Sequence, residues 1–223
     1  YEILNKNFPE VSKEDLIKSK GLKYSFTNYS NLYQSKKNNE CIKLLEEIFN
    51  EFFFIKLINK IKKEILISRI TKIPSVISLF RKIKLSTEHK NKNFFQKFLY
   101  SYFRYTFEFS YMYKNSYIAP HTDSTAKMIS LMLYFPNKEL ENQAIGTTFY
   151  ESTYKHFENK QPDLFLEENS NFFQKHFKET FTFPYKKKKL YCFIKSDMSW
   201  HSVKPLNIPE DQIRKSININ VNI

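Results

Sequence analysis

Apolar and polar residues alternate at every second position over two long stretches of this 223-residue chain. From Phe103 to Met112 aromatic residues alternate with mostly polar ones, and from Ser216 to Ile223 branched aliphatic residues alternate with asparagine. A two-residue period is typical of a strand with one buried face. Shorter β-rich runs are expected to form further strands: 117–137, 146–150, 180–183 and 190–194.

About eight short strands are therefore expected between residue 94 and the end of the chain, with almost no helix among them. This number and spacing predicts a mainly β fold, a sandwich or a jelly roll. The turn-forming residues 114–116 follow the strand 103–112 directly. We expect that strand to pair as a hairpin with the next one, which carries His121.

The N-terminal part shows a different period. Between residues 40 and 68 apolar residues recur at helical spacing on one broad face, which predicts one long helix or two, ended before Pro74. A shorter helix capped by Ser12 and ending near Gly21 precedes an alternating segment that favours an edge strand. We expect residues 1–93 to be mostly helical support, packed on one sheet of a single domain spanning 1–223.

Residues 151–178 are poorly periodic and rich in polar side chains. We interpret this stretch as an insertion with one helix and as a candidate lid, since long irregular segments of compact domains are often functional. It contains His156 and His176, both in solvated-looking surroundings.

The formal net charge of +13 is compatible with an anionic partner. Arginine, which suits bidentate contacts to phosphates and bases, occurs only four times, and the lysines are spread along the chain except at 186–189. That run is expected to be a solvated turn. The charge thus does not predict a nucleic-acid-binding protein, while an anionic substrate fits it.

Cysteine and glycine are both scarce. Cys41 and Cys192 are far apart and form neither a metal motif nor a disulfide framework, which indicates a reducing cytosol, and we expect a cytoplasmic protein. No apolar run has the length of a membrane span, and the first residues lack the apolar core of a signal peptide. With two glycines in the chain, asparagine is expected to occupy left-handed turn positions.

Candidate chemistry begins at His121 and Asp123, two residues apart in a β-rich segment. Residues i and i+2 of an extended strand point to the same face, so an imidazole and a carboxylate would lie side by side. A strand histidine alone is usually structural, but an aspartate on the same face is harder to explain as core. Nitrogen and oxygen ligands with open positions suit Fe(II).

A second stretch, about 80 residues later, contains His201 and then Arg214 and Ser216 at the start of the last strand. In this order the motifs His121-Thr-Asp123, a distant His201 and Arg214-Lys-Ser216 resemble the 2-oxoglutarate and Fe(II)-dependent dioxygenases, in particular the prolyl-hydroxylase-like branch. The resemblance covers about residues 94–223. It implies a double-stranded β-helix, a variant of the jelly roll.

The resemblance also implies a site. His121, Asp123 and His201 would hold Fe(II), and 2-oxoglutarate and O2 would take the remaining positions. Arg214 would bind the far carboxylate of 2-oxoglutarate, helped by Ser216 on the same face of the strand. The presence of Asp123 favours hydroxylation over halogenation, because halide-transferring members of the family lack this carboxylate. Two further cofactor-binding candidates are Tyr134, as a hydrogen-bond partner of 2-oxoglutarate, and Tyr111, as a wall of the pocket.

Several alternatives stay open. Arg214 follows His201 by more residues than is common in this branch, so Lys204 or Lys215 could bind the carboxylate instead. His156 or His176 could replace His201 as a ligand. Tyr134, Tyr111 and Trp200 could equally be aromatic core.

At the level of the whole protein, a cupin-like or Jumonji-like metal protein without 2-oxoglutarate and a non-catalytic β-sandwich binding module are the competing hypotheses. The motifs name no substrate, which could be a small molecule or a peptide, and they leave the oligomeric state open.

Overall fold

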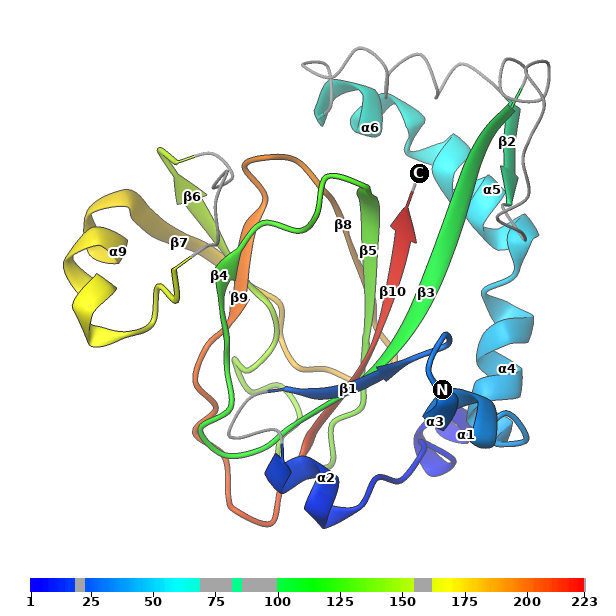
Figure 1. Cartoon of the computed structure of the whole chain (residues 1–223), viewed down its shortest axis with the longest axis horizontal. Coiled ribbons are helices and arrows are strands. Elements are labelled where there is room, and N and C mark those ends of the chain that lie inside the picture. Colours follow the sequence, from blue (N-terminus) through cyan, green and yellow to red (C-terminus); the bar gives the residue numbers. More distant parts are fainter. Residues whose placement is uncertain (19–22, 69–81, 86–99, 155–161, 223) are drawn as a thin grey trace.

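Two β-sheets face each other in the computed structural model, which describes residues 1–18, 23–68, 82–85, 100–154 and 162–222. Figure 1 shows the two sheets facing each other, with most helices on the outer side of the larger sheet. In these residues the protein is mainly β, and its strands pair antiparallel except for β2 with β3. None of the described helices is long and apolar enough to cross a membrane.

The larger sheet has six strands in the order β1-β3-β10-β5-β8, and β2 pairs with the beginning of β3. These strands are β1 (Tyr24–Thr27), β2 (Lys82–Leu85), β3 (Tyr100–Met112), β5 (Lys127–Tyr134), β8 (Leu190–Ile194) and β10 (Arg214–Asn222). The last strand of the chain therefore lies in the middle of the sheet, between β3 and β5.

The smaller sheet has four strands in the order β4-β9-β6-β7. They are β4 (Ile118–His121), β6 (Thr148–Ser152), β7 (Phe177–Thr182) and β9 (Trp200–Val203). The segment before β7 forms the 3-10 helix η1 (Glu167–Asn169) and helix α9 (Ser170–His176), which project from the end of the molecule away from the other helices (Figure 1).

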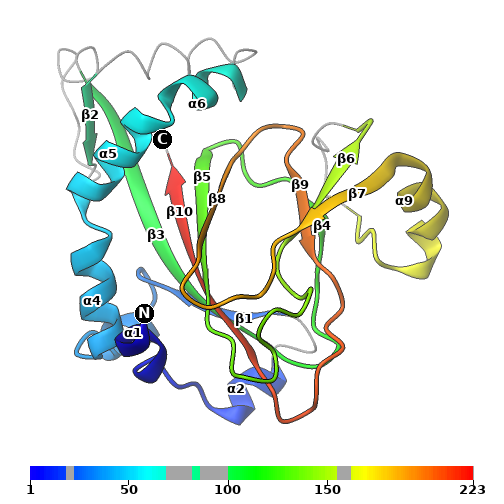
Figure 2. The same cartoon turned by 180° about the vertical axis from the view of Figure 1, so that it is seen from behind.

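The other helices belong to the N-terminal part: α1 (Glu2–Lys6), α2 (Lys13–Lys18), α3 (Asn31–Ser35), α4 (Glu40–Ile48), α5 (Glu51–Lys60) and α6 (Lys62–Ser68). Both views place α4, α5 and α6 along the outside of the larger sheet (Figures 1 and 2). The segment 40–68 is thus three helices, where one or two were predicted. One break falls at Asn50, whose side chain accepts from the backbone N–H of Phe53 and so caps α5.

The two faces of β10 meet different surroundings. Ile217, Ile219 and Val221 are fully buried in the main core, which also contains the apolar residues of the N-terminal helices. The alternate residues of β10, beginning with Arg214 and Ser216, point instead into the space between the sheets. The polar side of the predicted alternating strand therefore lines an internal cavity, and it is this cavity that contains the site.

Several predictions from the sequence are confirmed. The fold is mainly β, the strands 103–112, 190–194 and 216–223 appear as β3, β8 and β10, and β1 is an edge strand. Ser12 caps α2 by accepting from the backbone N–H of Asp15. Asn115 and Asn142 adopt the left-handed conformation, as expected in a chain poor in glycine, and Lys188 does so as well. Gly21 and Pro74 lie outside the described residues.

One prediction about pairing is wrong, and two features of the strands were not foreseen. β3 and β4 do not form a hairpin, because residues 113–117 carry the chain from the larger sheet to the smaller one, where β4 pairs with β9. Strand β9 itself was not predicted, because Trp200 to Val203 is too short for a clear alternation. The strand at His121 also ends there, so Asp123 lies just beyond β4.

Candidate metal centre

Strand pairing brings the two candidate histidines together. His121 is the last residue of β4, and its direct partner in the antiparallel ladder with β9 is His201. The ring centroids of the two imidazoles lie 4.4 Å apart. Asp123 follows in the loop after β4, and its carboxylate lies within 4 Å of Nε2 of both rings.

The distances within this group suit a single small cation. Nε2 of His121 is 3.9 Å from one carboxylate oxygen of Asp123, and Nε2 of His201 is 3.7 Å from the other. The three ligand atoms all lie within 4.8 Å of one another, and within the described ranges no other cluster of histidine, cysteine or carboxylate groups could hold a metal.

Backbone hydrogen bonds fix the tautomer of both imidazoles. Nδ1 of His121 lies 2.9 Å from the carbonyl oxygen of Ala119, and Nδ1 of His201 lies 2.9 Å from that of Ser199. Because a carbonyl oxygen only accepts, each Nδ1 must carry the proton, which leaves the lone pair on Nε2, facing Asp123. This is the arrangement in which a histidine is prepared to bind a metal.

The protonation states fit metal binding as well. Burial lowers the pKa of His201 to about 3, and burial also lowers the pKa of His121, so both rings are neutral at pH 7. Burial acts to raise the pKa of Asp123, but the groups around it lower the pKa overall; with both rings neutral at pH 7, the ammonium of Lys127 is the charge that keeps the carboxylate ionised. Two neutral imidazoles and one carboxylate on one side of an ion form a donor set suited to Fe(II).

Lys127 lies at the same carboxylate. Its ammonium donates to Oδ1 of Asp123 at 2.6 Å, and both side chains are largely buried. Ser130 lies on the other side, with its hydroxyl 3.4 Å from Oδ2. In this structure the charge of the ammonium balances that of Asp123, at the position where a metal cation would do so.

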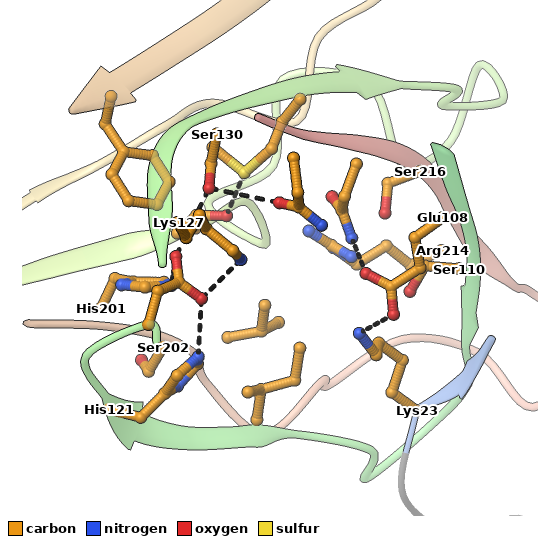
Figure 3. Close-up of a pocket in the computed structure, with 18 residues that line it drawn as sticks. Lys23, Glu108, Ser110, His121, Lys127, Ser130, His201, Ser202, Arg214 and Ser216 are labelled. Carbon is orange, nitrogen blue, oxygen red and sulfur yellow. Dashed lines mark hydrogen bonds and ion pairs between the residues drawn. The ribbon is translucent and has the colours of Figure 1, made fainter. Parts of the chain in front are cut away.

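The candidate ligands line one side of a cavity of about 110 Å³ between the sheets. A single water needs roughly 10–15 Å³ by the same kind of measure, so the cavity can hold a small organic molecule. Figure 3 shows His121 and His201 on one side and Arg214, Ser110 and Ser216 on the other. The cavity thus contains a metal-binding group and a cationic group in separate places.

Arg214 is 2% exposed. Its Nε donates to the carbonyl oxygen of Ile145 at 2.6 Å, one terminal nitrogen lies 3.5 Å from the sulfur of Met112, and the guanidinium lies 5.1 Å from the ring centroid of Tyr134. Among the described residues Arg214 forms no ion pair with a carboxylate. A buried guanidinium without an anion is costly, and a ligand carboxylate would compensate it with two parallel hydrogen bonds.

A second signal of a missing ligand lies next to Arg214. The hydroxyl of Ser110 is buried, lines the cavity, and has no hydrogen-bond partner in the described part of the chain. Ser110 is the direct ladder partner of Ser216, which lines the same cavity. The two hydroxyls and Arg214 form a group of donors that fits one end of a dicarboxylate.

The two predicted tyrosines have other positions. Tyr134 is fully buried beneath Arg214, and its hydroxyl bonds to the side chain and backbone N–H of Thr147. Tyr111 does not wall the pocket, because the strand alternates and Ser110 takes the inward side. Tyr111 points into the outer core, where its hydroxyl donates to the carbonyl oxygen of Pro9.

The alternative ligands lie elsewhere. His176 is outside the cavity, bonded to the hydroxyl of Thr153 on the α9 side, and His156 is outside the described residues. Lys204 pairs with Glu179 on the surface, and the ammonium of Lys215 lies over the ring of Phe8 in the outer core. Of the three cations considered for the far carboxylate, Arg214 is the one in the cavity.

Sequence reasoning missed most of the other polar residues that line the cavity, among them Lys23, Glu108, Ser110, Lys127 and Asn218. Glu108 and Ser110 could have been predicted from the sequence, because they lie two residues apart in the alternating strand 103–112 and therefore face the same side of the sheet. Lys127 lies four residues after Asp123 and had no motif to mark it. Lys23 comes from a different part of the chain, so only the fold could reveal it.

No family model and no curated protein matches the sequence. Several solved structures to which the chain is similar are 2-oxoglutarate and Fe(II)-dependent oxygenases, the class that its motifs resemble. One is a prolyl-4-hydroxylase from Pseudomonas putida, with a TM-score of 0.31 and 14% identity over 53% of this chain and 49% of that one, about half its length.

Two others align over nearly the whole chain. The Fe(II)/α-ketoglutarate-dependent dioxygenase TqaL has a TM-score of 0.44 and 10% identity over 99% of this chain and 73% of that one. HygX from Streptomyces hygroscopicus, solved with nickel and 2-oxoglutarate bound, has a TM-score of 0.33 and 8% identity over 96% and 87%. Similarity at this level assigns no function to this chain.

Proposed function

We propose that the protein is a non-haem Fe(II) and 2-oxoglutarate-dependent dioxygenase that hydroxylates its substrate. The observation that carries the proposal is the presence, in one cavity, of a nitrogen-nitrogen-oxygen ligand group and a buried guanidinium without a carboxylate partner. The first suits ferrous iron and the second suits a carboxylate of 2-oxoglutarate. The competing hypothesis of a metal protein without 2-oxoglutarate gives no role to the guanidinium of Arg214.

His121, Asp123 and His201 would hold the iron through two Nε2 atoms and a carboxylate oxygen. The bound iron and 2-oxoglutarate together supply the activation of O2, coupled to oxidative decarboxylation of the cosubstrate. Because the three ligands would lie on one side of the ion, other positions would be open to 2-oxoglutarate and O2. Asp123 would take a position that a halide needs, which supports hydroxylation over halogenation.

Arg214 would bind the far carboxylate of 2-oxoglutarate through its terminal nitrogens, with hydrogen bonds from Ser216 and Ser110. The ring of Tyr134 lies beneath the guanidinium of Arg214, and the carbonyl oxygen of Ile145 accepts from its Nε. The guanidinium is therefore held in place before the ligand binds. Tyr134 then acts by positioning Arg214, and its own hydroxyl bonds to Thr147 rather than to the cosubstrate.

The architecture supports the same proposal. A sheet with β3, β10, β5 and β8 facing a sheet with β4, β9, β6 and β7 supports a jelly-roll fold of the double-stranded β-helix kind. We propose that residues 1–223 form one such domain, with the N-terminal helices as support and the segment 151–178 as an insertion. The free thiols of Cys41 and Cys192 support a reducing cytoplasm, which also keeps iron ferrous.

The test is an anaerobic titration of the full chain with Fe(II) and then 2-oxoglutarate. We expect the weak visible charge-transfer band of a chelated 2-oxo acid, and then succinate formation when O2 is admitted. Arg214→Ala should weaken 2-oxoglutarate binding at least about tenfold, while metal binding, which reports that the fold is intact, stays as in the unchanged protein.

Arg104→Ala, on the same sheet but outside the cavity, is the matched control and should behave as the unchanged protein. Metal binding without any band, and with no effect of Arg214→Ala, would favour the cupin-like or Jumonji-like hypothesis. Absence of metal binding would favour the non-catalytic binding module.

A further inference from the structure

A second group of polar side chains lines the cavity on the side away from the candidate ligands. It consists of Lys23, just before β1, Glu108 on β3 and Asn218 on β10, and we refer to it as the Lys23 wall. Figure 3 shows Lys23 and Glu108 across the cavity from His121 and His201. The ammonium of Lys23 donates to one oxygen of Glu108 at 2.6 Å, and the amide nitrogen of Asn218 lies 3.3 Å from the other.

The Lys23 wall is distinct from the Arg214 group. Asn218 follows Arg214 by four residues of extended strand, which corresponds to roughly 13 Å between their Cα atoms. A five-carbon dicarboxylate spans only about 6 Å with ordinary bond lengths. The guanidinium is also held at its own end of the strand by Met112 and Ile145. A 2-oxoglutarate bound between Arg214 and the metal would therefore leave the Lys23 wall for another molecule.

The hydrogen-bonding groups that remain available in the Lys23 wall are mainly donors. Glu108 already accepts from Lys23 and Asn218, and these two residues together with Ser25 hold its pKa below the usual value against the effect of burial. Lys23 has three N–H donors, and in the described part of the chain it uses one of them, on Glu108. The wall thus presents an ammonium and a carboxamide, and its carboxylate is already occupied.

The net charge of the cavity also favours a negatively charged ligand. The charged side chains that line it, in the described residues, are Lys23, Lys127, Arg214, Asp123 and Glu108, which gives a net charge of +1. A divalent metal and a doubly charged 2-oxoglutarate would cancel each other. The loaded cavity would keep its single positive charge, and a ligand with one negative charge would neutralise it.

We propose that the substrate of this site carries a single carboxylate, which the ammonium of Lys23 and the side-chain amide of Asn218 bind. The proposal rests on the proposed oxygenase function, since it places this carboxylate in a cavity already holding metal and cosubstrate. Lys23 and Asn218 would then decide which molecules are accepted, while the carbon to be oxidised lies on the side of His121 and His201. Glu108 positions Lys23 and does not bind the substrate.

The test measures binding without turnover. The full chain is loaded with Zn(II) and saturating 2-oxoglutarate, so that the Arg214 group is filled, and is titrated in a calorimeter. The probes are butanoate, hexanoate and octanoate, each compared with its primary amide and its primary amine. At least one acid should bind about tenfold more tightly than its amide and its amine.

Variants then locate the binding. Lys23→Met should weaken binding of that acid about tenfold, and Lys23→Arg, which keeps the charge, should largely retain it. Glu108→Gln, which raises the net charge of the cavity, should strengthen it. The matched control is Lys114→Met, because Lys114 forms an exposed ion pair with Glu210 outside the cavity and its loss should change nothing.

Three results would overturn the inference: tighter binding of the amines than of the acids, no preference for any acid over its amide, or equal binding by the unchanged protein and Lys23→Met. The prior titrations with Zn(II) and 2-oxoglutarate report on the proposed function by themselves. Their failure would contradict the oxygenase, whereas their success with no preference for acids would contradict only the substrate class.

Discussion

His121 and His201 are direct partners in the β4–β9 ladder, and their rings lie 4.4 Å apart although 80 residues separate them in sequence. Each ring is fixed by the carbonyl oxygen two residues before it. The spacing of the two Nε2 atoms is therefore set by strand pairing and backbone hydrogen bonds, so the ligand group is in place before any ion binds.

The first prediction concerns the ligands. His201→Ala should weaken binding of Fe(II), or of Zn(II) as a redox-inert substitute, by more than about 100-fold, because even the loss of a group that only orients a ligand lowers affinity 10- to 100-fold. Calorimetry under anaerobic conditions measures the change.

His176→Ala is the matched control for this variant, since His176 lies outside the cavity and bonds to Thr153. It should bind the metal like the unchanged protein. A loss of metal affinity in His176→Ala, with little loss in His201→Ala, would show that His176 is the ligand in place of His201.

The second prediction concerns Lys127, whose ammonium occupies Oδ1 of Asp123. Lys127→Met should bind the metal about tenfold more tightly, because the ion no longer competes with the ammonium for that oxygen. The metal-free variant should be less stable by about 1–3 kcal/mol, because a buried carboxylate loses its charged donor.

Metal titration and denaturant unfolding of the metal-free protein measure the two effects. Lys204→Met, which breaks an exposed pair with Glu179, should change neither quantity by more than a few tenths of a kcal/mol. Weaker metal binding in Lys127→Met would mean that the ammonium supports the bound state instead.

The third prediction is a pH dependence of stability. The pKa of His201 in the folded protein is about 3, against 6.5 for a free imidazole. Between these values the unfolded chain binds a proton that the folded chain does not, so the metal-free protein loses stability as the pH falls below about 6.5. The slope contributed by this one imidazole approaches 1.4 kcal/mol per pH unit at about pH 5.

Denaturant unfolding at a series of pH values measures this slope. His121 has a lowered pKa too and adds to it with the same sign. His201→Gln should therefore reduce the slope of stability against pH by the contribution of one imidazole, about 1.4 kcal/mol per pH unit, without abolishing it. An unchanged slope in the variant would show that the ring of His201 titrates normally in the folded protein.

The fourth prediction uses the unbonded hydroxyl of Ser110. If that hydroxyl is a donor for 2-oxoglutarate, Ser110→Ala should weaken 2-oxoglutarate binding about three- to tenfold. The stability of the variant should be unchanged or slightly raised, because the substitution removes no hydrogen bond from the described part of the folded protein. Thermal unfolding and 2-oxoglutarate titration of the metal-loaded protein measure the two.

Ser202→Ala gives the opposite pattern in stability. Its hydroxyl bonds to that of Tyr150 at 2.8 Å, so the variant should lose about 1 kcal/mol. A Ser110→Ala protein that is destabilised to the same extent, with normal 2-oxoglutarate binding, would show that Ser110 serves the fold.

Features that depend on local sequence were predicted correctly, whereas the pairing of distant segments was not. The alternation from Phe103 to Met112 predicted β3, because a strand with one buried face shows its period locally. The pairing of β3 with β10 and of β4 with β9 could not be read in the same way, because ladder partners are chosen by segments far apart in sequence. The hairpin predicted across residues 114–116 was wrong for this reason.

Tyr111 shows the same limit on a smaller scale. The period of two says that Tyr111 and Ser110 face opposite sides, but it does not say which side is the cavity. In the structure the N-terminal helices cover the aromatic face of β3, and the serine side therefore faces inward.

The sequence by itself determined the mainly β character, the residues His121, Asp123 and His201 as candidate ligands, and Arg214 as a candidate anion-binding group, because short spacings and side-chain chemistry are local properties. The tertiary structure alone decided which of these residues meet, that Lys127 shares the carboxylate of Asp123, and that Lys23, Glu108 and Asn218 form a separate wall. These relations depend on the pairing of distant strands and on which sheet face is covered, and no local pattern encodes either.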